Sequence, residues 1–316
     1  MPIAVASHSF SKNSTLRREL LARHPRVTFN ETGLPLVRRD DLVALLRGHE
    51  RAITGLEVLD AAVFAAVPEL RVVSKYGVGL DMIDLAAARR HGVSVRWTPG
   101  VNRQAVAELT IAFMIALCRS VVPLALAVKT GGWTHPGGRQ LSSSTVGIVG
   151  CGHVGQEVAR LCRAFGATVL AHDIRTYEDF YRAHGVSAVT LDALLAESDI
   201  VTLHVPLDAS TRGLIGRREL ARLKPNAHLI NTARGGIVDE AALTEALAGG
   251  RLAGAAFDVF SEEPPTNSQL LSQPAFIGTP HIGGGTTEAV LAMGRAAIEG
   301  LDDPSREVPP SDLAVK

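Results

Sequence analysis

The sequence has no excess of charge of either sign. Its 316 residues include 32 Lys plus Arg and 32 Asp plus Glu, which gives a formal net charge of zero at pH 7. Composition therefore offers no electrostatic basis for nucleic acid or an anionic membrane as a partner. The hydrophobic share of 46% and the charged share of 20% are ordinary for a globular protein, and the length is enough for two domains.

Cysteines and long apolar runs are also scarce. The three cysteines, Cys118, Cys151 and Cys162, have neither metal-ligand nor redox-motif spacing, so we expect no metal site. Cys162 lies on the apolar face of a predicted helix, which favours a buried thiol in a reducing compartment. The most apolar stretch, residues 109–117, is too short to span a bilayer, and the first residues lack the pattern of a signal peptide. We therefore expect a cytoplasmic enzyme.

The most informative stretch is residues 145–173, which read TVGIVGCGHVGQEVARLCRAFGATVLAHD. An apolar run meets glycines at positions 150, 152 and 155, a helical pattern ends at Gly166, and a second apolar run ends at Asp173. Strand, glycine turn, helix, strand and terminal acid in this order are typical of a dinucleotide-binding βαβ unit.

Each glycine of this unit has a physical reason. Gly150 allows the tight turn, Gly152 lets the backbone approach a diphosphate, and Gly155 lets the helix pack close to the strand. The N–H groups at the start of the helix favour phosphates. Asp173 can accept hydrogen bonds from both ribose hydroxyls and repels a 2′-phosphate, which favours NAD over NADP. Arg175 can accommodate that phosphate, so some use of NADP stays open.

Strand and helix patterns alternate over most of the remaining chain, which predicts parallel sheets covered by helices. Strands are predicted at residues 3–6, 51–54, 70–74, 93–97, 200–205, 227–231, 255–259 and 276–278. Helices are predicted at residues 40–47, 59–67, 104–117, 191–197, 217–223, 240–248 and 287–301, with a further helix that Asp81 caps and Gly92 ends. Residues 131–144 are rich in Gly and Ser and predict a loop.

Three polar residues of different charge type directly follow predicted strands. These residues are Arg234, Glu263 and His281. Ligands of doubly wound sheets lie outside the carboxyl ends of the strands. Each residue alone is more often an ordinary surface residue, but together, beside a dinucleotide fold, they form a candidate acid/base set.

Five segments of the sequence resemble the NAD-dependent D-2-hydroxyacid dehydrogenases. The segments are KYGVGLDMID, TPGVNRQAVAEL, NTARGGIVDE, AAFDVFSEEPP and TPHIGG. The resemblance covers nearly the whole chain and is closest to the phosphoglycerate dehydrogenase branch, without a C-terminal regulatory domain. It implies an α/β fold of two doubly wound parallel-sheet domains with a cleft between them. A flavodoxin-like substrate domain is expected at residues 1–98 and 286–316, and a Rossmann NAD-binding domain at residues 99–285.

The resemblance also implies roles for individual residues. Arg234 grips the substrate carboxylate, His281 donates and accepts the proton, and Glu263, which directly precedes a proline, is the carboxylate partner of His281. A neutral imidazole can take the hydroxyl proton, a nearby carboxylate raises its pKa, and a planar guanidinium suits a carboxylate. The implied substrate-binding residues are Lys75, Tyr76, Gly77, Val78, Gly79, Arg234 and His281. The implied cofactor-binding residues are Gly150, Gly152, His153, Val154, Gly155, Asp173, Ile174, His204, Val205, Pro206, Thr211, Thr232, Ala233, Arg234, Asp258, His281 and Gly283.

The predicted activity is hydride transfer between NAD and C2 of a small anionic D-2-hydroxy acid or 2-oxo acid. Phosphoglycerate itself stays open, because no Arg follows Thr54 and Gly55 where that branch tends to have one. Glu263 replaces the Gln of formate dehydrogenases, which argues against formate. Lys75 is either a surface lysine or a substrate ligand, as in relatives that oxidise phosphite or phosphonates, so a dehydrogenase of a phosphorus oxyanion is one alternative.

An alternative of another class is an NAD(H)-sensing, corepressor-like binding protein. The two expected domains imply closure about hinges near Thr98, Pro99 and Gly100 and near Gly283, Gly284 and Gly285. The predicted helix at residues 104–117 is apolar nearly all round and must be buried on most sides. This helix suggests a homodimer, as in the relatives.

Overall fold

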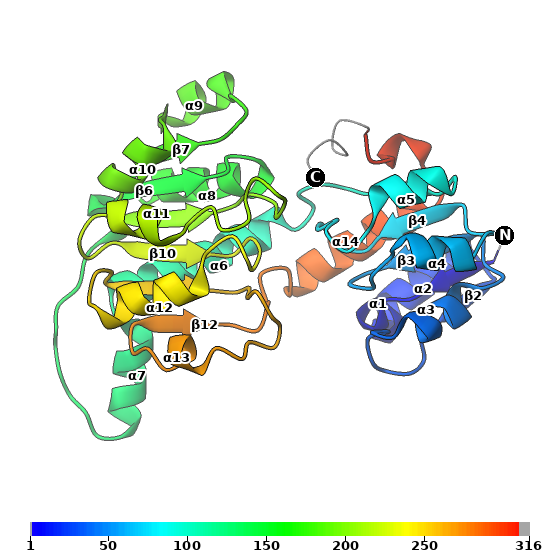
Figure 1. Ribbon diagram of the computed structural model, residues 1–316, viewed down its shortest axis with the longest axis horizontal. Coiled ribbons are helices and arrows are strands. Elements are labelled where there is room, and N and C mark those ends of the chain that lie inside the picture. The colour runs from blue at the N-terminus through cyan, green and yellow to red at the C-terminus, as the bar shows by residue number, and fades with distance from the viewer. Residues whose placement is uncertain (1, 310–316) are drawn as a thin grey trace. The chain divides into compact units, whose positions relative to one another are not determined.

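The computed structural model describes residues 2–309. The chain forms two compact units, which we call the N-terminal unit (Met1–Asn102 with Thr286–Lys316) and the central unit (Arg103–Gly285). Residues 310–316, which the sequence assigned to the substrate domain, lie outside the described residues. Figure 1 shows the elements of both units along the chain.

The central unit is built on a seven-stranded parallel sheet in the order β12-β11-β10-β9-β6-β7-β8. The order reverses between β6 and β9, and this is the point at which doubly wound sheets bind ligands. Its strands are β6 (Thr145–Val149), β7 (Thr168–His172), β8 (Val186–Ala188), β9 (Ile200–Leu203), β10 (His228–Asn231), β11 (Gly254–Phe257) and β12 (Phe276–Gly278).

Helices cover both faces of this sheet, so its middle strands β9 and β10 are buried throughout. Leu194, Leu220 and Leu243 belong to the apolar cluster on one face, and Met114 and Val158 to the cluster on the other. The helices are α6 (Arg103–Cys118), α7 (Val121–Lys129), α8 (His153–Ala164), α9 (Glu178–His184), α10 (Leu191–Glu197), α11 (Arg217–Arg222), α12 (Glu240–Ala248) and α13 (Ser268–Leu271), with a 3₁₀ turn at Leu141–Ser143.

The N-terminal unit has a five-stranded parallel sheet in the order β2-β1-β3-β4-β5. Its elements are β1 (Ile3–Val5), α1 (His8–Lys12), α2 (Ser14–Arg23), β2 (Val27–Phe29), α3 (Arg39–Leu46), β3 (Arg51–Thr54), α4 (Ala61–Ala66), β4 (Val72–Lys75), α5 (Leu85–Arg90), β5 (Ser94–Arg96), α14 (Thr287–Gly300) and a 3₁₀ turn at Pro304–Arg306. Gly294 of α14 faces Leu16, and Ser74 Oγ donates to the Ala297 carbonyl at 2.7 Å. The chain therefore returns to its first sheet through α14.

The predicted α/β class with two parallel sheets is confirmed, but some local predictions are wrong. The helix after β4 is capped by Asp84, whose Oδ1 accepts from the Ala87 N–H at 2.9 Å, and not by Asp81. Ile83 is buried and forms a β-bridge with Leu59, which delays the start of α5. The same bridge keeps Leu59 extended, so α4 begins at Ala61 rather than at Leu59.

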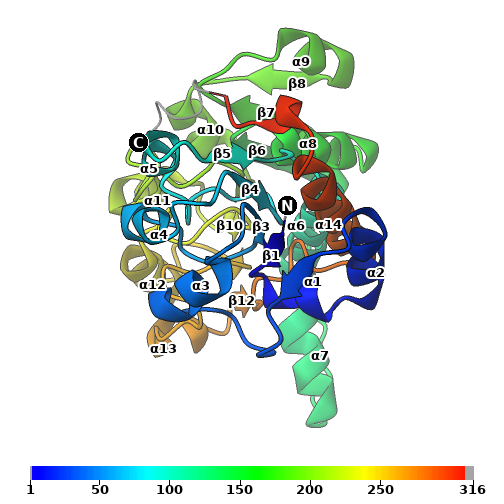
Figure 2. The ribbon, with the colours of Figure 1, turned by 90° about the vertical axis from the view of Figure 1, so that its right-hand side faces the viewer.

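The sequence patterns did not reveal α1, α2, β2, α7, α9, β8 or α13. Several of these are only three to seven residues long, and α7 buries none of its residues. Figures 1 and 2 both show α7 projecting from the body of the central unit. No single helix of residues 2–309 is long and apolar enough to cross a bilayer. Only α6 and α7 together meet that criterion, by length and composition alone, and they are bent by 65°.

Candidate active site

The turn from β6 into α8 has the geometry of a phosphate cradle. Gly150 has a φ of 91°, and a Cβ added there would lie 2.7 Å from the His204 carbonyl carbon. A Cβ at Gly155 would lie 2.0 Å from the Gly150 oxygen, whereas a Cβ at Gly152 would meet nothing within 4 Å. The outer glycines are therefore needed for packing, and the middle glycine borders open space. The helix that begins at His153 and Val154 presents its first N–H groups there.

Asp173 directly follows β7 and is tied to the glycine turn. Its Oδ2 accepts from the Cys151 N–H at 2.6 Å, and its Oδ1 accepts from the Arg175 N–H at 2.8 Å. Each carboxylate oxygen keeps a second acceptor site, so contact with a ribose remains available. Ile174 is exposed beside it. The acid thus stabilises the turn in addition to the role predicted from its spacing.

The loop after β9 lies against the same turn. The His204 N–H donates to the Val149 carbonyl at 2.7 Å, and His204 Nε2 lies 3.0 Å from Thr202 Oγ1. Burial lowers the pKa of His204 to about 3, so its imidazole is neutral. A Cβ added at Gly150 would also clash with Val205 Cγ1, so Val205 packs closely against this glycine. Thr211 Oγ1 donates to the Pro206 carbonyl at 2.6 Å, which closes the loop on itself.

Arg234 follows β10 in a turn that Asn231 organises. Asn231 is buried, its Nδ2 donates to the Arg234 carbonyl at 2.8 Å, and its Oδ1 accepts from the Ala233 N–H at 3.1 Å. Thr232 Oγ1 lies 2.9 Å from Thr110 Oγ1 of α6. Sequence analysis missed Asn231 and Thr110. An Asn at the end of an apolar strand, three residues before the Arg, was the available signal.

Asp258 follows β11 and holds the loop that carries His281. Its Oδ1 accepts from Thr279 Oγ1 at 2.6 Å and from the Ile282 N–H at 2.7 Å, and its Oδ2 accepts from the Gly283 N–H at 2.7 Å. A Cβ at Gly283 would lie 3.0 Å from Asp258 Oδ2, so glycine gives room for this close contact. The carboxylate is 1% exposed and its contacts are with this loop. The predicted contact of Asp258 with a cofactor stays a prediction.

His281 and Glu263 form a hydrogen-bonded pair at this edge of the sheet. His281 Nδ1 lies 2.9 Å from Glu263 Oε2, and Glu263 Oε1 accepts from the Phe260 N–H at 3.1 Å. The neighbouring Glu262 instead accepts from Thr266 Oγ1. His281 has a φ of 54°, and its N–H is shared between the carbonyls of Asp258 and Thr279. A non-glycine residue in this strained region is typical of functional sites.

The pair is electrostatically coupled. The hydrogen bond to Glu263 raises the pKa of His281 above its ordinary value, and burial opposes that rise. Burial acts to raise the pKa of Glu263, but the bonds to His281 and Phe260 and the charges of His281 and Arg234 together lower it. The bond through Nδ1 leaves Nε2 as the nitrogen that can exchange a proton with a ligand.

Residues 75–79 lie in the N-terminal unit at the carboxyl end of β4. Lys75 is 4% exposed and its Nζ donates to the Gly55 carbonyl, so it is not a surface lysine. Gly77 has a φ of 117°, and the Val78 carbonyl accepts from Trp97 Nε1 at 2.8 Å. Tyr76 is buried with its ring edge-on to Phe10, so the ring belongs to the core. Gly79 completes the segment. That residues 75–79 bind the same substrate as Arg234 and His281 stays a prediction.

The central unit is thus a dinucleotide-binding domain of the Rossmann class with an imidazole–carboxylate pair at the carboxyl edge of its sheet. The chain belongs to the D-isomer specific 2-hydroxyacid dehydrogenase family, because residues 111–283 match the model of that family's NAD binding domain. The cofactor predicted from the glycine turn is therefore the cofactor of the family.

Similar proteins agree with this assignment. The chain is 42% identical to the D-3-phosphoglycerate dehydrogenase of Bacillus subtilis, over 75% of this chain and 45% of that protein. It is 41% identical to the glyoxylate reductase of Korarchaeum cryptofilum, over 80% and 79% of the two chains. The crystal structure of the TT0316 protein from Thermus thermophilus superposes with a TM-score of 0.84 at 34% identity, covering 98% of this chain and 99% of that chain. The chain spans about half the length of the first two curated phosphoglycerate dehydrogenases that it matches.

Proposed function

We propose that the protein is an NAD-dependent oxidoreductase that transfers a hydride between the nicotinamide and C2 of a small D-2-hydroxy acid or 2-oxo acid. The observation that carries this proposal is the bond between His281 Nδ1 and Glu263 Oε2, on a loop held at the carboxyl edge of a dinucleotide-binding sheet. None of the relatives compared above favours the two alternatives, oxidation of a phosphorus oxyanion or NAD(H) sensing without turnover.

The residues present fit the cofactor. The open space at Gly152 and the N-terminus of α8 suit a diphosphate, and Asp173 suits a ribose diol. The remaining predicted contacts, in the loops after β9, β10 and β12, lie at the same edge of the sheet. NAD, when bound, supplies the hydride acceptor or donor for C2.

The residues of the chain supply the proton and the orientation. His281 Nε2 takes the hydroxyl proton in oxidation and returns it in reduction. Glu263 fixes the tautomer through Nδ1 and favours the imidazolium. Arg234 binds the substrate carboxylate through its planar guanidinium, with the backbone N–H groups of the nest at residues 77–79 as a second support. The residues 1–98 with 286–316 are proposed as the substrate domain and 99–285 as the cofactor domain.

A panel of 2-oxo acids tests this function. We expect the protein to oxidise NADH in the presence of glyoxylate or hydroxypyruvate, and to use NADPH more slowly because of Asp173. The measurement is the loss of reduced-cofactor absorbance with each acid. NADH binding without turnover of any tested acid would favour a sensing role, and reduction of NAD by phosphite would favour a phosphorus oxyanion.

We also propose a homodimer, but through α7 rather than α6. Nine of the sixteen residues of α6 are buried, among them Ile111, Phe113 and Met114 in the core of the central unit, so its apolar surface is largely used. In contrast, α7 has the sequence VVPLALAVK and no buried residue. Its exposed apolar side chains include Val121, Val122, Leu126 and Val128.

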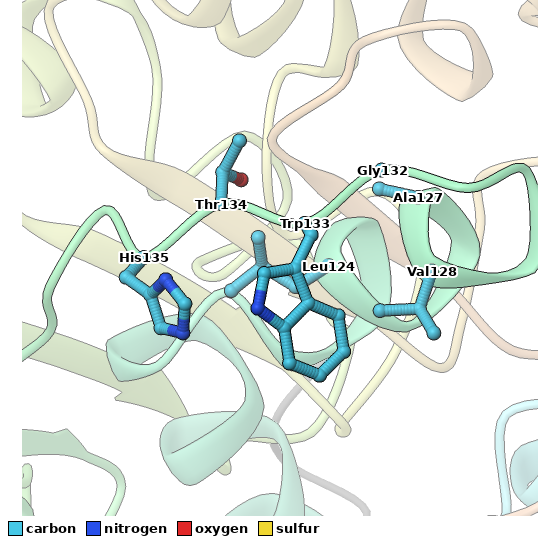
Figure 3. A pocket seen from close by; sticks show the side chains of 7 residues that line it. All are labelled: Leu124, Ala127, Val128, Gly132, Trp133, Thr134 and His135. Atoms are coloured by element: carbon cyan, nitrogen blue, oxygen red, sulfur yellow. The ribbon is translucent and has the colours of Figure 1, made fainter.

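The segment after α7 adds to this apolar surface. Trp133 is 78% exposed, and Figure 3 shows its indole beside Leu124 and Val128 in a pocket that Gly132 and His135 also line. An exposed apolar patch of this kind marks an interaction site. Members of the family typically form homodimers, so we expect the partner at this surface to be a second copy of this chain.

Light scattering with size-exclusion chromatography tests the dimer. We expect twice the chain mass at micromolar concentration, and the mass of one chain for Leu126→Asp. Leu271→Asp, at an exposed leucine of α13, is the matched control and should leave the mass unchanged. A monomeric wild type would contradict the proposal.

We also propose that the protein works in a reducing compartment such as the cytoplasm. Its three cysteines are free and buried, which supports this proposal.

A further inference from the structure

We propose that Glu57 is a specificity-determining residue that restricts the protein to substrates with a single negative charge. The preferred substrates are then small 2-oxo and 2-hydroxy monocarboxylates without a phosphate group. This inference rests on the proposed function and names the substrate class of the same site.

The structure buries Glu57 where an apolar side chain is expected. Glu57 is 5% exposed, whereas its neighbours Leu56 and Val58 are 71% and 63% exposed. Glu57 Oε2 accepts from the Gly55 N–H at 2.6 Å, directly after β3. Burying a charge costs free energy unless it is paired and hydrogen-bonded. A loop that buries a carboxylate and exposes two apolar side chains therefore indicates that the charge has a role at this edge of the sheet.

Lys75 brings the opposite charge to the backbone of the same residue, Gly55. It ends β4, the strand that pairs with β3, and is 4% exposed. Its Nζ donates to the Gly55 carbonyl, while Glu57 binds the N–H of the same residue. A Cβ at Gly77 would lie 3.7 Å from Lys75 Nζ, so the ammonium group borders the glycine nest proposed for the substrate carboxylate.

The two buried charges set what the nest accepts. A lysine alone would favour a highly charged anion, but the carboxylate of Glu57 offsets its charge. One substrate carboxylate is still held by the directed N–H groups of the nest. A phosphate carries about −1.5 to −2 charges at neutral pH and needs ammonium or guanidinium partners. At this loop the ammonium group of Lys75 is offset by the Glu57 carboxylate, which repels the additional charge of a phosphate. Water screens buried charges only weakly.

Hydroxypyruvate and 3-phosphohydroxypyruvate form a suitable test pair, because they differ by one phosphate group. For the wild type we expect kcat/KM with NADH to be at least about 100-fold higher for hydroxypyruvate than for 3-phosphohydroxypyruvate. A phosphate group without a cationic partner in the site readily accounts for a discrimination of this size. Glu57→Gln keeps the shape and the acceptor for the Gly55 N–H but removes the charge. We expect it to shift the ratio of the two kcat/KM values by about tenfold or more toward the phosphorylated acid.

Two further variants control for charge and for folding. Glu31→Gln removes one charge from the same unit at a side chain that is 70% exposed, and it should leave the ratio unchanged. Glu57→Asp keeps the charge and should keep the wild-type ratio. Melting temperature and NADH affinity report whether each variant is folded. If Glu57→Gln does not fold, the ratio of the two kcat/KM values of the wild type decides whether the inference holds.

The outcomes separate the inference from the function on which it rests. A wild type that prefers the phosphorylated acid, or a folded Glu57→Gln variant with an unchanged ratio, overturns the role of Glu57 and leaves the proposed function intact. If no 2-oxo acid is turned over with NADH, the proposed function and this inference fail together.

Discussion

The two units place a carboxylate and a basic side chain at the carboxyl edges of their sheets, but under opposite conditions. In the central unit, the side chains of His281 and Glu263 are 41% and 39% exposed and bonded directly to each other. In the N-terminal unit, Lys75 and Glu57 are 4% and 5% exposed and bind opposite ends of the Gly55 residue. The exposed pair is suited to exchanging a proton, and the buried pair to presenting fixed charges to a ligand.

This difference indicates a division of roles. A group that exchanges protons must be reached by substrate and must have a pKa near the working pH, which solvent access and a single partner permit. A group that selects among substrates acts more strongly when water does not screen it. Variants of the exposed pair should therefore change turnover and its pH dependence, and variants elsewhere should change affinity, stability or specificity.

Removing the imidazole tests this division most severely. We expect His281→Ala to lower kcat for reduction by ~10³-fold, within the range of general acid–base catalysis, while NADH affinity stays nearly intact. Steady-state turnover and NADH fluorescence titration measure the two quantities. His91→Ala, at an exposed histidine of the N-terminal unit, is the control. Unchanged turnover in the His281 variant would rule out its role.

Removing the carboxylate of the exposed pair should change the pH profile. The bond to Glu263 raises the pKa of His281, so reduction, which needs imidazolium, persists at low pH and declines as pH rises through that pKa. Glu263→Gln removes the cause of the rise. We expect kcat/KM to fall by ~10–100-fold and the decline to begin at a lower pH. Glu262→Gln, which removes the adjacent acid bonded to Thr266, should leave the profile unchanged.

Two glycines of the turn should have different roles, Gly152 in cofactor affinity and Gly155 in stability. A methyl group at Gly152 enters open space where a diphosphate is expected, so Gly152→Ala should raise the NADH dissociation constant by at least ~10-fold with little change in melting temperature. A methyl group at Gly155 meets the Gly150 oxygen, so Gly155→Ala should destabilise the fold by roughly 1–3 kcal/mol. Equal effects of the two variants on both quantities would contradict this assignment of the glycines.

How far the sequence predicts these features depends on the kind of signal. The glycines, Asp173 and the polar residues after the strands were identifiable because turn geometry and strand ends restrict residue type and spacing. Most strands of both sheets were identifiable from short apolar runs, but β2 and β8, each three residues long, were not. The pairing of His281 with Glu263 rather than Glu262 came from family resemblance alone, because the two acids are adjacent in a loop without periodicity.

Other features have no local signal. Burial of Glu57 and Lys75 depends on tertiary packing, and an isolated acid or lysine in a loop is usually exposed. The same limit applies to α6 and α7. Both have helical, apolar sequences, yet one is buried within its unit and the other buries no residue there, which only the structure distinguishes. The loop-holding contacts of Asp258 also required the structure, because its partners are 21 to 25 residues away.

The smallest expected effect concerns Asn231, which contacts neither member of the exposed pair. Its side chain joins the Arg234 carbonyl to the Ala233 N–H and so fixes the turn that presents the guanidinium. Asn231→Asp keeps the acceptor for Ala233 but loses the donor to Arg234. Because misplacing a binding group weakens substrate orientation, we expect KM for the 2-oxo acid to rise by ~10-fold, with the pH profile of His281 retained. A change in the pH profile, with KM unaltered, would show instead that Asn231 acts on the proton-exchanging pair. The separation of proton exchange from substrate binding would then not hold within the central unit.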